Sequence, residues 1–374
     1  MVNIKDKLNQ TENKFPNEFI TYFENKFHFQ NIELSELLKE NERIAYWEEF
    51  YAQSIESNAI SFLKKCFPQL RFPIAYEIEK SQIYKNAVLK GQFEILNLEN
   101  ELQLINAEQI KISIYDSFAG KIPVILIPNE FDFIKIVQCL LYKNNPTPVP
   151  LSMGALMING INNWDRLNKL KKSWTPSNLK DQDSLLQTIQ SYPHLYKDRL
   201  IICSTKPYSN VAASKLKMGN EEWLNASYII RLEHECTHLY TLKNYASASN
   251  NLHDELIADY IGITKALGKF KKEWMLEFLG LEDFPKYRKG ARLENYLESI
   301  NLDSESFGYF SHIIYSAIEN ISIFDDSLGE IQSNEDRCIR INCLCETGLL
   351  NMASENGGNI LVENYKKLKL SNQT

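Results

Sequence analysis

The sequence predicts a soluble α+β protein with a mixed sheet in the middle of the chain and helices before and after it. Strand-like and helix-like segments alternate between residues 92 and 205, whereas the flanking segments carry apolar residues at helical spacing. With 374 residues and 44% hydrophobic content, the chain can bury a substantial core in one or two domains.

Three regions follow from this pattern. Residues 1–90 form a helical N-terminal region, residues 91–270 form the α+β region that carries the candidate site, and residues 271–374 form a helical region that closes a cleft. We find no repeat, no low-complexity tract and no linker rich in Gly, Pro or Ser, so one integrated domain is the alternative.

The individual elements are predicted in order from apolar spacing and turn residues. Aromatic-rich helices are expected within residues 15–65, and Pro68 and Pro73 end that pattern. Strands are expected at 92–98, 101–106, 110–115 and 121–127, and a helix is expected at 130–143. A buried strand at 199–205 precedes a helix capped by Asn220, which runs to residue 243. The later helices are expected at 253–267, 271–280, 291–300, 304–319 and 335–352.

The segment 146–166 contains prolines and glycines that favour an irregular backbone. It has two interpretations, a long surface loop or a wall of a substrate cleft. In the second case its polar end would supply hydrogen bonds or a stacking surface, from Asn162, Asn163, Trp164, Asp165 and Arg166.

Charge and cysteine usage exclude several classes of protein. The net charge of −7 is spread along the chain, which gives no basic field for nucleic acid or an anionic membrane. The polar N-terminal residues lack the apolar core of a signal peptide, and no later run is long enough to span a bilayer, so a cytoplasmic location is expected. The seven scattered cysteines argue against a disulfide framework, and we interpret Cys236 as a core residue.

The motif HECTH is the strongest functional signal. His234 and His238 are four residues apart, so on a helix both imidazoles lie on one face and can bind one metal ion. Glu235 is placed to accept the proton of a water molecule that zinc activates. A charged, solvated helical face is the alternative interpretation of this motif.

A second motif, HDELIAD, follows within twenty residues and repeats this geometry. Glu255 and Asp259 share one face of the second helix, and the small residues Ala258 and Gly262 beside them allow close helix approach. The short polar segment between the motifs favours a reversal that makes the two helices antiparallel neighbours. Glu255 would be the third ligand, leaving a fourth zinc position for water and substrate, and Asp254 and Asp259 are placed to accept the free histidine N–H groups.

Together, HECTH and DELIAD resemble the gluzincin branch of the zincin metallopeptidases. This resemblance implies a zincin-like fold in which a mixed sheet packs on the active-site helix, and a sheet edge that can bind an extended peptide. It also implies that Asp259 supports His234 and that Asp254 supports His238, although many gluzincins carry Asn at the position of Asp254. The wider strings FPQLRFPI, SMGA and NNWDR resemble an uncharacterised bacterial family of unknown activity.

A zincin also recruits an electrophile from the downstream region. His312 is the catalytic candidate that we retain from a wider set, which comprises Arg288, Arg292, Tyr309, His312 and Tyr315. His253 adjoins the second motif and is a further candidate for a supporting contact.

The function expected from these motifs is zinc-dependent hydrolysis of peptide or amide bonds, with Glu235 as general base. Two alternatives stay open. Two histidines and one carboxylate can hold Fe2+ for non-hydrolytic chemistry in a biosynthetic pathway, which does not require Glu235. The chain can also be a catalytically silent zincin scaffold that binds a peptide. The substrate and the oligomeric state do not follow from the sequence.

Overall fold

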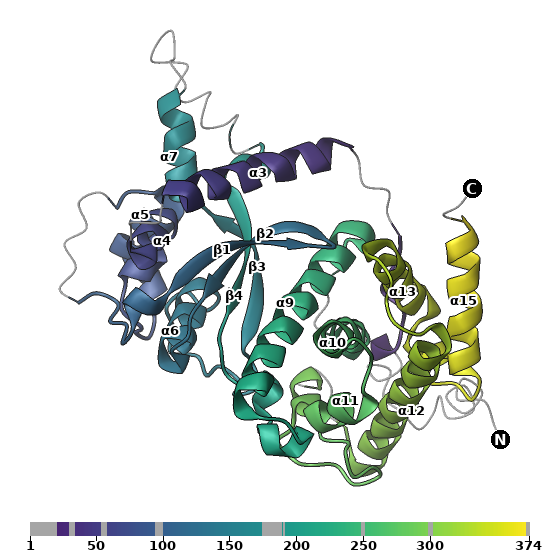
Figure 1. Cartoon of the computed structure of the whole chain (residues 1–374). Helices are drawn as coiled ribbons and strands as arrows, with labels where there is room; N and C mark the ends of the chain where they lie inside the picture. Colours follow the sequence, from purple (N-terminus) through teal and green to yellow (C-terminus); the bar gives the residue numbers. More distant parts are fainter. Residues whose placement is uncertain are drawn as a thin grey trace. The chain divides into compact units, whose positions relative to one another are not determined.

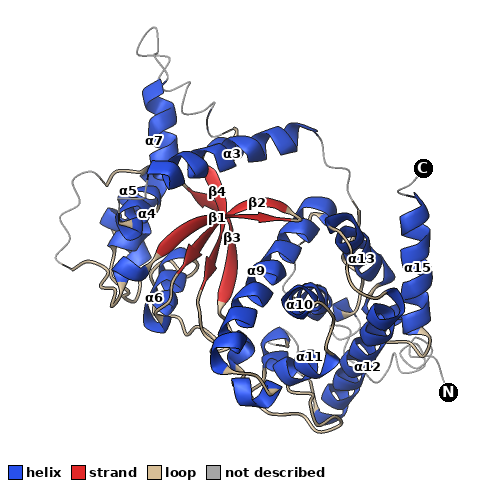
Figure 2. Ribbon diagram, in the orientation of Figure 1, coloured by secondary structure: helices blue, strands red, loops and turns tan. Residues whose placement is uncertain are grey.

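The computed structural model describes residues 21–29, 34–53, 58–93, 100–173, 189, 191–247, 251–297 and 302–371. Two compact units make up the chain. Unit 1 comprises residues 1–31 and 207–374, and unit 2 comprises residues 32–206. The predicted α+β class is confirmed, because unit 2 contains a mixed sheet and helices occur in both units (Figure 2).

The helices and strands of unit 2 follow the middle of the chain. Its α-helices are α3 (Leu34–Gln53), α4 (Ala59–Cys66), α5 (Gln82–Lys90), α6 (Glu130–Leu140) and α7 (Trp164–Ser173). Its strands are β1 (Lys111–Ser117), β2 (Gly120–Leu126), β3 (Ala155–Asn162) and β4 (Lys197–Cys203). Short 3₁₀ elements connect them, namely η2 (Pro68–Arg71), η3 (Ile78–Lys80), η4 (Ala107–Gln109) and η5 (Pro193–Leu195).

The four strands form one sheet in the order β1-β2-β4-β3. β1 and β2 are an antiparallel hairpin, β2 and β4 are parallel, and β4 and β3 are antiparallel. The β3–β4 register shifts between Asn159 and Ile161, where Gly160 has a φ of +82° that a residue with a side chain rarely adopts. The sheet is therefore mixed, as the alternation of segments predicted.

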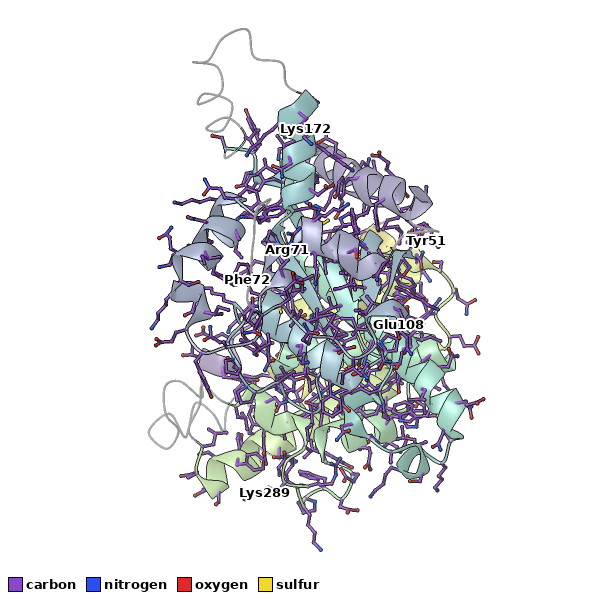
Figure 3. The ribbon with its side chains drawn as sticks, turned by 90° about the vertical axis from the view of Figure 1, so that its left-hand side faces the viewer. Tyr51, Arg71, Phe72, Glu108, Lys172 and Lys289 are labelled. Carbon is purple, nitrogen blue, oxygen red and sulfur yellow. The ribbon has the colours of Figure 1, made fainter. Side chains whose placement is uncertain are left out.

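Two apolar clusters stabilise unit 2. The larger one joins the sheet to α3, α4 and α6, with Trp47, Phe67 and Phe133 fully buried in it. The smaller cluster contains Phe72, labelled in Figure 3, whose ring meets that of Tyr84 edge to face at 5.0 Å between centroids. Burying aromatic rings of this size supplies much of the hydrophobic stabilisation of such a core.

Most predicted elements of the middle region have counterparts, and some differ. The strands expected at 110–115, 121–127 and 199–205 are present. The strand expected at 101–106 is absent, and most of the segment 92–98 lies outside the described residues. The segment 146–166 is less irregular than expected, because residues 155–162 pair with β4 and α7 begins at residue 164. Pairing with a central strand has overridden the local effect of the prolines and glycines.

Unit 1 is helical in its described part. Its α-helices are α9 (Asn220–Tyr245), α10 (Leu252–Leu267), α11 (Lys272–Leu279), α12 (Ser304–Leu328), α13 (Asn334–Thr347), α14 (Leu349–Met352) and α15 (Gly357–Ser371). Its 3₁₀ elements are η6 (Tyr208–Asn210), η7 (Ala213–Leu216) and η8 (Arg292–Tyr296). Figure 1 shows α10 at the centre of this unit, beside α9, α11 and α13.

The predicted region boundaries at residues 90 and 270 do not coincide with this division. The boundary lies at residue 207 because α9 and α10 pack with α11 and α13, whereas all four described strands belong to unit 2. Contacts between segments that are distant in sequence define the limits of a domain. Local composition does not reveal these contacts.

Three helix predictions need correction. Gly219 is the N-cap of α9 and Asn220 is its first residue, so the predicted asparagine cap is wrong. The expected helix 291–300 is the short element η8, and residues 298–300 lie outside the described part. The expected helix 335–352 is interrupted at Gly348, whose φ of +74° is incompatible with helical geometry.

None of the helices in the described part of the chain combines the length and the apolar character needed to cross a bilayer. All seven cysteines are free thiols, and Cys236 is fully buried, as the core interpretation predicted. A buried thiol of this kind behaves as a small apolar side chain.

Candidate metal centre

The two motif helices pack closely against each other in unit 1. Asn251 caps α10 by accepting a hydrogen bond from the Asp254 amide, and Gly268 ends the helix in the left-handed conformation. A Cβ atom on Gly262 would lie 2.8 Å from the Ile230 carbonyl oxygen of α9, a distance that real Cβ atoms essentially never show. The expected close approach of the helices at Gly262 is therefore present.

Both helices are more deeply buried than the sequence predicted. α10 is buried on every side from residue 252 to residue 264, and α9 is buried on every side from residue 230 to residue 237. The motif residues therefore do not form a solvated helical face. Burial of several ionisable groups requires that they compensate one another or hold a cation.

The structure brings His234, His238 and Glu255 into one buried group whose ligand atoms lie within 4.8 Å of one another. The two histidine Nε2 atoms are 3.0 Å apart. Each imidazole faces a different carboxylate oxygen of Glu255, at 3.4 Å for His234 Nε2 and 3.5 Å for His238 Nε2.

These separations fit a four-coordinate metal ion. At a bond length of about 2.0–2.1 Å, two ligands of a tetrahedral zinc ion lie about 3.3 Å apart, and two ligands at a right angle lie about 2.9 Å apart. The separations of 3.4 and 3.5 Å are measured to different oxygens of Glu255, and each lies near the tetrahedral value for the oxygen concerned, whereas the 3.0 Å separation of the two Nε2 atoms lies closer to the right-angled value. Two imidazoles and a carboxylate are also a donor set that zinc commonly uses.

The orientation of His234 gives a second reason for a cation at this point. Its Nδ1 lies 2.9 Å from Asp259 Oδ1, a contact that fixes the ring. A neutral imidazole that donates from Nδ1 carries its lone pair on Nε2. That lone pair is directed at the group formed with His238 and Glu255, so a positive charge there, either a shared proton or a metal ion, is needed to avoid mutual repulsion.

His238 is held less tightly. Its Nδ1 lies 3.2 Å from Asp254 Oδ2, which is an ion-pair distance, but the two buried atoms lack the alignment of a hydrogen bond. Asp254 Oδ1 accepts a long bond of 3.4 Å from the Thr241 hydroxyl. The structure thus places both aspartates beside the histidines to which the resemblance assigned them, with Asp259 making the better-aligned contact.

Asp259 is itself fixed by two residues that sequence reasoning did not place there. The Tyr208 hydroxyl donates to Asp259 Oδ1 at 2.5 Å, and the Arg292 guanidinium forms a buried ion pair with Asp259 Oδ2. Arg292 also donates to the Tyr208 hydroxyl at 2.9 Å and to the Ser209 hydroxyl at 3.1 Å. A buried carboxylate with these donors stays ionised, and the pKa of Asp259 is held below its usual value despite the opposing effect of burial.

Glu255 has a corresponding partner in Tyr296. The Tyr296 hydroxyl donates to Glu255 Oε2 at 2.8 Å, and this is the oxygen that faces His234. Burial raises the pKa of Tyr296 well above its usual range, and the charge of Glu255 adds to this effect, so the hydroxyl remains a donor. Arg292 and Tyr296 are four residues apart, as are Glu255 and Asp259. This equal spacing is the one feature of the sequence that relates Arg292 and Tyr296 to their partners on α10.

The protonation of the two histidines depends on this environment. Burial alone would lower the pKa of His234, but Glu255 and Asp259 outweigh burial and raise it to about 9. Burial is likewise outweighed at His238, where Asp254 and Glu255 raise the pKa well above its usual value. In the metal-free protein the two rings together therefore hold an added proton, which the 3.0 Å contact between their Nε2 atoms can share and which a divalent cation must displace.

The catalytic candidates differ in where the structure places them. Glu235 is buried on α9 between the two histidines in sequence. His312 is exposed on α12, and its ring stacks on Phe284 with centroids 5.8 Å apart. The exposed position of His312 does not support its expected role, whereas Tyr208, Arg292 and Tyr296 contact the centre directly.

The residues expected in a substrate cleft belong to unit 2 and form bonds within it. Asn163 and Arg166 both bind the buried carboxylate of Asp198, at 2.6 and 2.8 Å. The Trp164 indole donates to the Val88 carbonyl, and Asp165 accepts a bond from the Tyr46 hydroxyl. Asn162 is the last residue of β3. These contacts account for the polar side chains through the packing of unit 2, and their role in a cleft stays a prediction.

With this geometry established, comparison with known proteins gives one result. A model described as a family of unknown function, DUF7005, matches residues 5–356. The chain belongs to this family. No curated protein and no solved structure matches it. Membership of DUF7005 supplies no activity, so a function has to be argued from the centre itself.

Proposed function

We propose that this member of DUF7005 is a zinc-dependent hydrolase of peptide or amide bonds. The observation that carries the proposal is the convergence of His234, His238 and Glu255 in a buried group with Glu235 beside the first ligand in sequence. A zinc ion bound by these residues supplies a Lewis acid that activates water and polarises a carbonyl group. Three protein ligands are typical of catalytic zinc sites.

Each residue of the centre has a defined task in this proposal. His234 and His238 bind through Nε2, since Asp259 and Asp254 face their Nδ1 atoms. Glu255 supplies the third ligand. Glu235 accepts the proton of the attacking water and returns it to the leaving nitrogen.

The proposal predicts separate effects on metal binding and on hydrolysis. Glu235→Gln should keep stoichiometric zinc but lower the hydrolytic rate by about 100-fold or more, because a general base typically contributes ~10²–10⁴-fold. Glu222→Gln is the matched control on the same helix, since Glu222 is exposed in its first turn. The assay is elemental analysis followed by digestion of a mixed peptide pool, with products identified by mass spectrometry. Full activity of Glu235→Gln, or purified protein without stoichiometric metal, overturns the proposal.

The Fe2+ alternative makes the opposite prediction for the same variant. Non-hydrolytic chemistry at two histidines and one carboxylate does not use Glu235. Two measurements distinguish zinc-dependent hydrolysis from Fe2+ chemistry. They are elemental analysis of protein purified without added metal, and activity assays with and without oxygen. Glu235 beside the histidines favours the hydrolytic proposal, because the non-hydrolytic chemistry has no task for it.

A cytoplasmic location is part of this proposal. Seven free cysteines are typical of a reducing compartment. The proposed substrate is a peptide or an amide-containing small molecule.

A further inference from the structure

The element η8 (Arg292–Tyr296) contacts the candidate metal centre through two side chains whose spacing matches that of their partners. Arg292 and Tyr296 are four residues apart, as are Glu255 and Asp259 on α10. Arg292 pairs with Asp259, and Tyr296 binds Glu255, so the two pairs are matched in opposite chain order. Through these two side chains, η8 contacts the candidate ligand Glu255 and also Asp259, the carboxylate that orients His234.

We infer that η8 is a clamp whose closure and metal binding stabilise each other, and that Tyr296 is the positioning residue that links them. The inference rests on the metal centre of the proposed function, but it does not depend on hydrolysis. Tyr296 acts through Glu255 and has no part in the reaction of the substrate.

The role of Tyr296 follows from the two oxygens of Glu255. A carboxylate can rotate about its last side-chain bond, and this torsion has broad minima. The 2.8 Å bond from Tyr296 to Oε2 selects the orientation in which Oε2 faces His234 and Oε1 faces His238. Residues that orient metal ligands in this way typically contribute ~10–100-fold to metal affinity.

η8 is one short 3₁₀ element, and Arg292 and Tyr296 connect it to the centre. The described 3₁₀ turn has amide bonds from Glu294 to the Ala291 carbonyl and from Leu297 to the Glu294 carbonyl. Such short turns have poor hydrogen-bond geometry and open easily. Arg292 binds Asp259, which is not a candidate ligand, whereas Tyr296 binds Glu255, which is one. The direct link between η8 and the metal therefore runs through Tyr296 and Glu255.

The first test measures Zn2+ affinity by competition with a chelator for the full-length wild type and two tyrosine variants. Tyr296→Phe removes only the hydroxyl and should weaken binding by about 10–100-fold. Tyr260→Phe is the matched control, because the Tyr260 hydroxyl also donates to a buried carboxylate at 2.8 Å, that of Asp325. The control should bind Zn2+ like the wild type. The visible spectrum of the Co2+-loaded protein should change in Tyr296→Phe and not in Tyr260→Phe, since it reports ligand geometry.

The second test measures hydrogen exchange of the peptide that contains the Glu294 and Leu297 amides. Zn2+ binding and closure of η8 are coupled, and such coupling acts equally in both directions. Zn2+ should therefore slow exchange of these amides by up to the factor by which Tyr296 raises the Zn2+ affinity. The Tyr296→Phe variant should lose this slowing. If wild type binds Zn2+ and Tyr296→Phe has the affinity, Co2+ spectrum and exchange of the control, the clamp is refuted and the metal centre stands. If wild type binds no Zn2+, the metal centre and the clamp both fail.

Discussion

The pH dependence of metal binding is the most direct consequence of the buried charges. Glu255 and Asp259 raise the pKa of His234 to about 9, and Asp254 and Glu255 raise the pKa of His238 well above its usual value. A divalent ion must therefore replace protons. Since one pKa unit corresponds to a tenfold change, displacing the His234 proton alone should raise the apparent Zn2+ affinity by about 30-fold between pH 6.5 and pH 8.

Two measurements check this prediction. Chelator competition at several pH values gives the slope of affinity against pH, and a pH indicator in weakly buffered solution counts the protons released by each Zn2+. The expected count near pH 6.5 is at least one, the proton of His234. His253 does not contribute, because burial lowers its pKa to about 4 and the ring is neutral throughout this range. An affinity that does not change with pH, or a release of no protons, refutes the assignment of charged imidazoles to the metal-free protein.

The same pKa shift fixes the sign of a stability change. His234 has a pKa of about 6.5 when unfolded and about 9 when folded, so the protonated ring stabilises the metal-free protein by roughly 3 kcal/mol below pH 6.5. This contribution is lost as the pH rises through 9. The melting temperature of the metal-free protein should fall from pH 6.5 to pH 9, whereas the fall should be smaller in protein saturated with Zn2+. An equal fall in both forms contradicts the reasoning.

Two further predictions concern packing around the centre. Gly262→Ala should lower stability by about 1–3 kcal/mol and weaken Zn2+ binding, because the added Cβ atom meets the Ile230 carbonyl of the neighbouring helix. Gly308→Ala is the control in α12, where an added Cβ atom has no neighbour within 4 Å. This control should be neutral or stabilising by up to about 1 kcal/mol. Chemical denaturation and chelator competition check both, and equal effects of the two substitutions would contradict the close approach. Arg340→Met should cost about 3–5 kcal/mol by leaving the buried Asp325 without its cation, yet leave Zn2+ affinity unchanged. A large loss of affinity in this variant would show that the Asp325 pair is coupled to the centre.

The alternation of segments in the sequence predicted the α+β class and most strands of the sheet. Apolar runs of strand length at 121–127 and 199–205 are local signals, and both lie in β2 and β4. The segment 146–166 was misjudged because β3 forms by pairing with β4, and pairing between distant segments leaves little trace in local composition. The division of the chain near residue 207 likewise depends on packing between segments that are distant in sequence.

The sequence by itself determined which motif side chains share a helical face. Spacing of four residues on a helix places His234 with His238 and Glu255 with Asp259, because helical periodicity alone puts such residues on one face. Only the tertiary structure decided that both helices are buried and that Tyr208, Arg292 and Tyr296 complete the site. The residues in these contacts are 33 to 84 positions apart in the sequence, from Arg292–Asp259 to Arg292–Tyr208, so chain packing rather than local spacing brings them together.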